Sequence, residues 1–206
     1  MIEFIIGSSL AAAAGLNAWM PLLLLGLADR LLPVFALPAG WSWLSSDVAL
    51  WVVGALLVLE IVADKIPALD SVNDIIQSVI RPAAGGIAFG AGAGSQTVTM
   101  DDPASFFADG TWVPVVIGVA IALAVHILKA SARLAANATT GGIAAPVLST
   151  VEDGASFALA AAAIVVPVLA GILLLGLIIG AVLLLRRLAR RRRRGRDAAI
   201  EGPVQT

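Results

Sequence analysis

The sequence predicts an all-α protein that crosses a lipid bilayer several times. Of its 206 residues, 60% are hydrophobic and only 13% are charged, and the mean hydropathy is +0.99. Soluble domains contain about 45–50% apolar and about 25% charged residues. The net charge of −1 hides an asymmetry, because eight of the thirteen basic residues lie between Arg186 and Arg196. We expect one transmembrane domain at 1–185 and a disordered, Arg-rich cytoplasmic tail at 186–206.

Apolar stretches of about 20 residues predict the membrane-spanning helices. The first is 3–28; it lacks the basic region that a cleaved signal peptide needs and carries Glu3 instead. The second, 48–63, is short and is completed by the polar end Glu60–Lys65. The remaining candidate spans, which bring the total to six, are 82–98, 112–130, 132–151 and 155–185.

The segment 67–81 has helical periodicity but two different faces. Val72, Ile76 and Val79 belong to an apolar face, while Asp74 and Arg81 belong to a polar one. This pattern predicts a helix that lies in the membrane interface or forms one arm of a re-entrant hairpin.

The basic residues indicate the orientation of the spans. If the Arg run is cytoplasmic, six crossings place twelve of the thirteen basic residues on the cytoplasmic side, as the positive-inside rule demands. This count requires 132–151 to cross, because Lys129 and the Arg run would otherwise need opposite sides. It predicts an inner (plasma) membrane protein with both termini in the cytoplasm.

Charged residues within the apolar chain are the candidate functional groups, since a charge at the bilayer centre costs about 2.5–3.5 kcal/mol. Glu60 and Asp64 share one helix face at spacing i, i+4, and His126, Lys129 and Arg133 share another at i, i+3, i+7. The two sets could form an ion-pair network that locks the helices, or a proton or ion relay that lines a cavity. Exposure of the charges among lipid headgroups is a third interpretation.

Two candidate spans contain helix-breaking residues. Asn17 lies in the middle of the first span, and Pro21 frees its carbonyl from the helical hydrogen bond. The fifth span is interrupted between Asn137 and Pro146. Broken helices in two halves of a membrane protein are typical of transporter sites. A metal site made from Glu60, the neighbouring Asp64 and His126 is chemically possible, although the pattern is unspecific. The absence of cysteine excludes thiolate ligands and disulfides.

Several segments resemble a known family of bacterial multi-pass membrane proteins, the domain of unknown function 4126. The resemblance extends from residue 3 to 185, and its most specific part is the series A-D-K-I-P…D…R-P within 63–82. Thr-Thr-Gly-Gly after Asn137 departs from the family pattern. The resemblance implies a multi-pass membrane fold and brings no established activity. The family pattern falls on Asn17, Pro21, Asp64, Lys65, Pro67, Asp70, Arg81, Pro82, His126, Lys129, Arg133, Asn137, Glu152 and Asp153.

The sequence therefore predicts a small transporter or channel for an ion or small polar solute, proton-coupled through Glu60 or Asp64. One alternative is a membrane-embedded enzyme that acts on lipid or phosphate groups, and the other is a non-catalytic scaffold subunit. The enzyme would use Asp64, Asp70, Asp74 and His126. Glu152 and Asp153 are expected to be solvated at the outer mouth of the last two spans. The predicted pathway residues are Asn17, Glu60, Asp64, Lys65, Asp70, Asp74, Arg81, His126, Lys129, Arg133 and Asn137.

The expected partners follow from composition. The small residues of 82–98 favour a homo-oligomer through close helix packing, and the Arg run favours anionic lipids. No nucleic acid and no cofactor is expected.

Overall fold

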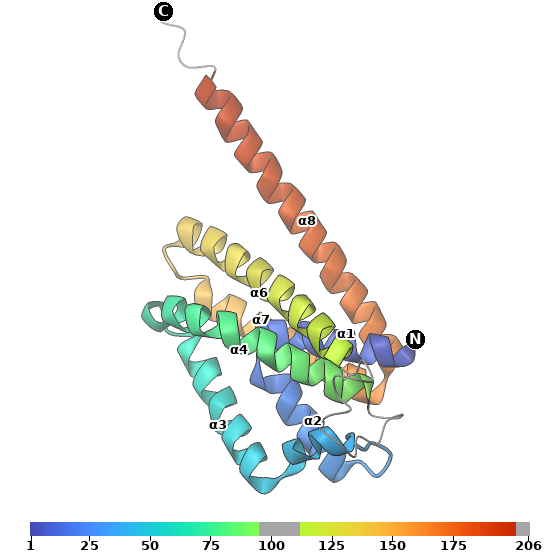
Figure 1. The fold of residues 1–206 in the computed structure, drawn as a ribbon. Helices are drawn as coiled ribbons and strands as arrows, with labels where there is room; N and C mark the ends of the chain where they lie inside the picture. The colour runs from blue at the N-terminus through green and yellow to red at the C-terminus, as the bar shows by residue number, and fades with distance from the viewer. Residues whose placement is uncertain (95–111, 201–206) are drawn as a thin grey trace, which may run out of the picture.

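The computed structural model describes residues 1–94 and 112–200, and of 67–72, 184–185 and 188–200 it describes the backbone only. Within these parts the chain is helical and contains no strand, so the all-α class is confirmed (Figure 1). The end of the predicted span 82–98 lies outside the described residues. The elements are α1 (Ile2–Leu16), α2 (Trp19–Leu31), the 3-10 helix η1 (Ala39–Ser45), α3 (Asp47–Ala63), α4 (Pro67–Ala93), α6 (Trp112–Thr140), α7 (Ala145–Val165) and α8 (Pro167–Ile200).

The helix lengths are those of a membrane protein, but they do not confirm six spans. Among the described residues, α6 and α7 are long and apolar enough to cross a bilayer. A third span results if η1 and α3, which are bent by 64° relative to each other, are counted together. α1 and the first half of α8, Pro167–Leu183, are apolar but shorter.

The predicted separate helix at 67–81 is the first half of α4. Pro67 begins α4, where a missing N–H is tolerated. Pro82 lies inside the helix and does not end it, so the division at this proline is wrong. Farther along, α4 packs tightly against α6: a Cβ at Gly85 would lie 2.2 Å from the Ala122 Cβ. This glycine contact lies within one chain, and the homo-oligomer stays a prediction.

The predicted span 132–151 is also wrong. α6 continues to Thr140, and the chain then turns through Gly141 and Gly142, whose φ angles are 61° and 89°. Left-handed glycines of this kind end helices and reverse the chain. α6 and α7 therefore form a hairpin, and the interruption expected between Asn137 and Pro146 is the turn of that hairpin.

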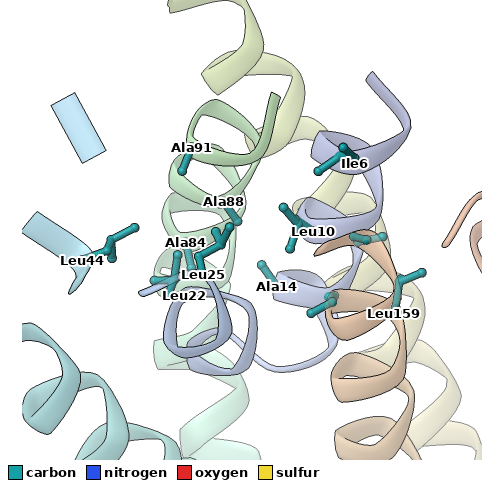
Figure 2. Close-up of a cluster of buried hydrophobic side chains, with 14 of the residues drawn as sticks. Ile6, Leu10, Ala14, Leu22, Leu25, Leu44, Ala84, Ala88, Ala91 and Leu159 are labelled. Carbon is teal, nitrogen blue, oxygen red and sulfur yellow. The ribbon is translucent and has the colours of Figure 1, made fainter. Parts of the chain in front are cut away.

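α1 is the central helix of the bundle. It contacts α4, α6, α7 and α8, and its residues 6–16 are all buried. Figure 2 shows Leu10 and Ala14 of α1 between Ala84 and Ala88 of α4 on one side and Leu159 of α7 on the other. Small side chains in α1 and α4 let these helices approach closely, as is typical of helix packing in membranes.

α3 lies at the edge of the bundle, apart from the central helices (Figure 1). Its only buried residues are Val53, Leu57 and Glu60, and Trp51 is 81% exposed. Ser46 caps its first turn by accepting the N–H of Ala49. α3 therefore packs on the bundle mainly through one row of three buried side chains, the last of which is Glu60.

Candidate functional site

The predicted interruption of the first span lies at Asn17. This residue has extended backbone angles, φ −144° and ψ 120°, and separates α1 from α2. Its side-chain Oδ1 accepts the backbone N–H groups of Trp19 at 3.2 Å and Met20 at 3.1 Å. Asn17 thus acts as an N-cap for α2, which satisfies two of the free donors at that helix end.

Two charged side chains complete the helix ends at this break. Glu60 Oε2 accepts the N–H of Ala18 at 3.2 Å, at the start of α2. Lys129 Nζ donates to the carbonyl of Leu16 at 2.8 Å, at the end of α1. A helix carries partial positive charge at its N-terminus and partial negative charge at its C-terminus. Each end therefore faces the opposite charge.

Arg81 connects the break to α4. Its Nη2 donates to Glu60 Oε1 at 2.7 Å, its Nε donates to the same oxygen at 3.3 Å, and the guanidinium lies 3.6 Å from Asp64. The Arg81 residue is 0% exposed. A buried guanidinium needs paired carboxylates to offset its desolvation, and the two acids at the end of α3 supply them.

Asp64 is the centre of the remaining ion pairs. Its Oδ2 lies 3.2 Å from Lys129 Nζ and 3.3 Å from Arg133 Nη2, and its Oδ1 accepts from Asn73 Nδ2 at 2.6 Å. Arg133 and Lys129 also contact Glu152 Oε2, at 2.6 and 3.2 Å. The carboxylates of α3 and α7 thus share the two cations of α6.

Glu152 and Asp153 are members of this network that the pathway prediction missed. Asp153 Oδ1 accepts from Asn17 Nδ2 at 3.0 Å, and Lys65 Nζ lies 3.4 Å from the other oxygen. The expectation that both acids are solvated at an outer mouth is wrong, because the turn after α6 brings the first half of α7 within reach of Arg133 and Lys129. The spacing of polar residues in α7 could have indicated a buried polar face. Ser149, Asp153 and Ser156 follow one another at i, i+4, i+7, and all three are buried.

His126 extends the network toward a small pocket. Its Nδ1 lies 3.1 Å from Arg81 Nη1, and its Nε2 lies 3.1 Å from Ser78 Oγ. Because a guanidinium can only donate, these partners assign the proton of a neutral His126 to Nε2. The pocket, about 260 Å³ in volume, is lined by Asp74, Ile75, Ser78, His126, Ala130 and Leu134.

The other predicted residues occupy different positions. Asp74 lies at the pocket, and one of its carboxylate oxygens is 3.9 Å from Arg81. Asn137 lies one helical turn beyond Arg133, and its Oδ1 is buried without a hydrogen-bond partner in the described structure. Of Asp70 only the backbone is described, in the first turns of α4.

The proposed metal site of Glu60, Asp64 and His126 is not formed. In the described parts of the chain, no three His, Cys, Asp or Glu side chains are arranged to hold a metal ion. The ring nitrogens of His126 have Arg81 and Ser78 as partners. The arrangement is instead a largely buried set of ion pairs between five acids (Glu60, Asp64, Asp74, Glu152, Asp153) and four bases (Lys65, Arg81, Lys129, Arg133).

The comparisons with known proteins agree with the resemblance seen in the sequence. A family model described as Domain of unknown function (DUF4126) matches residues 4–187. No curated protein and no solved structure matches the chain. Since the match covers most of the sequence, the chain belongs to the DUF4126 family of domains of unknown function.

Proposed function

We propose that this protein is a small membrane transporter for an ion or small polar solute, coupled to protons through Glu60. The observation that carries the proposal is the discontinuous helix α1–α2, whose two ends meet the charges of Glu60 and Lys129. Secondary transporters form their substrate and ion sites at discontinuous helices of this kind. Both termini in the cytoplasm and a bacterial inner membrane belong to the same proposal.

The pocket beside His126 is joined to this break by polar side chains. A chain of polar contacts leads from Ser78 to His126, from His126 to Arg81, and from Arg81 to Glu60, with separations of 3.1, 3.1 and 2.7 Å. Each step lies within hydrogen-bonding distance. A proton or a small cation that enters the pocket meets Asp74 first, and it reaches Glu60 only if Arg81, which can only donate hydrogen bonds, moves aside.

The hydrogen bonds of Glu60 support proton coupling through this residue. Glu60 accepts hydrogen bonds from Arg81 on α4 and from the backbone of Ala18 at the start of α2. A proton on Glu60 removes the charge that holds Arg81 and weakens the link between α3, α2 and α4. Protonation of one residue thus changes contacts among three helices, which is what a transport cycle requires of its coupling group.

Reconstitution into liposomes tests the proposal. Purified protein is incorporated into vesicles that contain a pH-sensitive dye, a potassium diffusion potential is imposed, and proton entry is followed with and without a panel of monovalent cations and small polar solutes. The variants are Glu60→Gln and Asp64→Asn, and Asp47→Asn is the matched control because Asp47 is an exposed acid of the same helix, paired with Arg30.

We expect wild type and Asp47→Asn to carry solute-dependent proton flux above that of empty vesicles, and Glu60→Gln to lose the proton component. Size-exclusion profiles and circular dichroism establish that each variant is folded. Wild-type flux equal to that of empty vesicles over the whole panel refutes transport. Equal flux in wild type and Glu60→Gln refutes the coupling through Glu60.

One observation favours a second candidate, a non-catalytic membrane scaffold. Lys65, Arg81, Lys129 and Arg133 each lie within 3.4 Å of a carboxylate oxygen. A network in which each of these cations is paired can also hold the helices in one fixed arrangement. The scaffold predicts no flux for any solute and a large loss of stability when a pair is broken, so the flux assay separates the two candidates.

A further inference from the structure

A second hollow lies on the side of the bundle formed by α1, α6 and α8. It is a groove of about 440 Å³ whose lining includes Phe4 and Ala12 of α1, Leu128 of α6 and Val182 of α8. Among the lining residues whose side chains the structure describes, Ser8 is the only polar one. The volume falls within the range of about 300–1,000 Å³ typical of pockets for single small molecules.

We propose that this groove binds one anionic phospholipid, with an acyl chain between the helices and the phosphate against Arg186 and Arg187. On α8, Leu174, Ile178 and Val182 line the groove at spacing i, i+4, i+8. Arg186 follows four residues later and therefore belongs to the same helix face. Arg186 and Arg187 are both exposed.

The dimensions fit a chain that runs along α8. From Leu174 to Val182 the helix rises about 12 Å, and Arg186 lies one further turn along, at a rise of about 1.5 Å per residue. Near its start α8 packs on α1, where a Cβ at Gly171 would lie 3.4 Å from Ile5. Beyond that contact α8 diverges from the bundle toward its C-terminal end (Figure 1). Arg186 and Arg187 thus lie on the part of α8 that has left the bundle, with the helix continuing beyond them to Ile200.

The charge pattern favours a lipid over a second copy of the chain as the occupant. An apolar groove that continues into two exposed arginines is complementary to a molecule with an apolar tail and an anionic head. Each arginine near an anionic surface contributes about a fivefold gain in affinity, so the pair contributes about 30-fold. A helix from a second copy of the chain is about 10–12 Å across, wider than a lipid acyl chain. The apolar face that such a helix would place in the groove contains no acid to pair with Arg186 and Arg187.

Native mass spectrometry of the full-length protein in detergent provides the test, with phosphatidylglycerol and phosphatidylcholine titrated separately. Ala181→Trp fills the groove, and Ile179→Trp is its matched control, because Ile179 is 51% exposed and does not line the groove. Arg186→Gln/Arg187→Gln removes the headgroup contacts, and Arg193→Gln/Arg194→Gln removes two charges farther along the same run.

We expect wild type to retain one phosphatidylglycerol and Ala181→Trp to lose it, while Ile179→Trp behaves as wild type. Arg186→Gln/Arg187→Gln is expected to weaken phosphatidylglycerol binding about 30-fold with little change for phosphatidylcholine. A photoactivatable phosphatidylglycerol should cross-link wild-type protein within 121–128 and 174–182, which requires no variant to fold.

Three results would overturn the proposal. The first is equal lipid retention in Ala181→Trp and Ile179→Trp. The second is an equal loss in the two double arginine variants, which would show a general surface attraction. The third is a dimer that Ala181→Trp dissociates, which would identify a second copy of the chain as the occupant.

Discussion

Replacement of Arg81 by Met tests whether the buried ion pairs hold the helices together. At an effective dielectric constant of about 20, a separation of 2.7 Å from Glu60 corresponds to an attraction of about 6 kcal/mol, and 3.6 Å from Asp64 to about 5 kcal/mol. Desolvation of the ions, several kcal/mol for each, offsets much of this attraction. Removal of one partner from a buried pair costs about 3–5 kcal/mol, because the other charge stays buried.

The assay is thermal unfolding in detergent micelles, supported by titration with a denaturing detergent. For a chain of this length, a loss of about 3–5 kcal/mol lowers Tm by roughly 6–20 °C. Arg30→Met is the matched control, because Arg30 forms an exposed pair with Asp47, and such pairs contribute about 0–1 kcal/mol.

A double-mutant cycle completes the test. Glu60→Gln retains an oxygen that can accept the N–H of Ala18. The loss of unfolding free energy in Glu60→Gln/Arg81→Met is therefore expected to be smaller than the sum of the losses in the two single variants, by a coupling energy of about 2 kcal/mol. An Arg81→Met variant with the Tm of wild type, or a double variant whose losses simply add, would refute the view that this pair holds α3 to α4.

Three further predictions concern the backbone, each measured as a change in Tm or in the free energy of unfolding. Asn17→Ala should cost about 1–2 kcal/mol, since it removes the cap of α2 as well as the bond to Asp153; an unchanged stability would show that the break needs no cap. Gly85→Ala should cost about 1–3 kcal/mol, because its Cβ would overlap the neighbouring helix. Gly54→Ala is its control, because a Cβ at Gly54 would have no neighbouring atom within 4 Å; it should be neutral or stabilising by up to about 1 kcal/mol. Equal effects at Gly85 and Gly54 would contradict the close helix contact at Gly85. Gly141→Ala should cost about 1–2 kcal/mol because φ is 61° there, whereas a neutral effect would mean that the turn rearranges freely.

The sequence predicted most of the charged groups that meet inside the bundle, but not Glu152 and Asp153. Glu60 and Asp64 share a face because they are four residues apart, and Lys129 and Arg133 share another for the same reason. Pairing of the two sets was one of three interpretations that the sequence left open, and the structure has them 3.2–3.3 Å apart at Asp64. The break at Asn17 followed from a polar residue and a proline within an apolar stretch.

The topology was less predictable, because hydropathy does not distinguish a crossing from a turn between two helices. The segment 132–151 was assigned as a span to satisfy the distribution of basic residues, and Gly141 and Gly142 were counted as part of it. The structure has a turn at these glycines, which brings Glu152 to Arg133. The continuation of α4 through Pro82 depends on packing against α1 and α6, and a local pattern contains no information about that packing.

The edge position of α3 has a mechanical consequence. Glu60 and Asp64 lie at the end of α3, a helix with three buried residues, whereas Arg81 and Lys129 belong to helices whose backbones approach closely at Gly85 and Gly118. A swing of α3 about its attachment to the bundle would move its two carboxylates relative to Arg81 and Lys129, so the ion pairs at this end of the helix fix the position of α3.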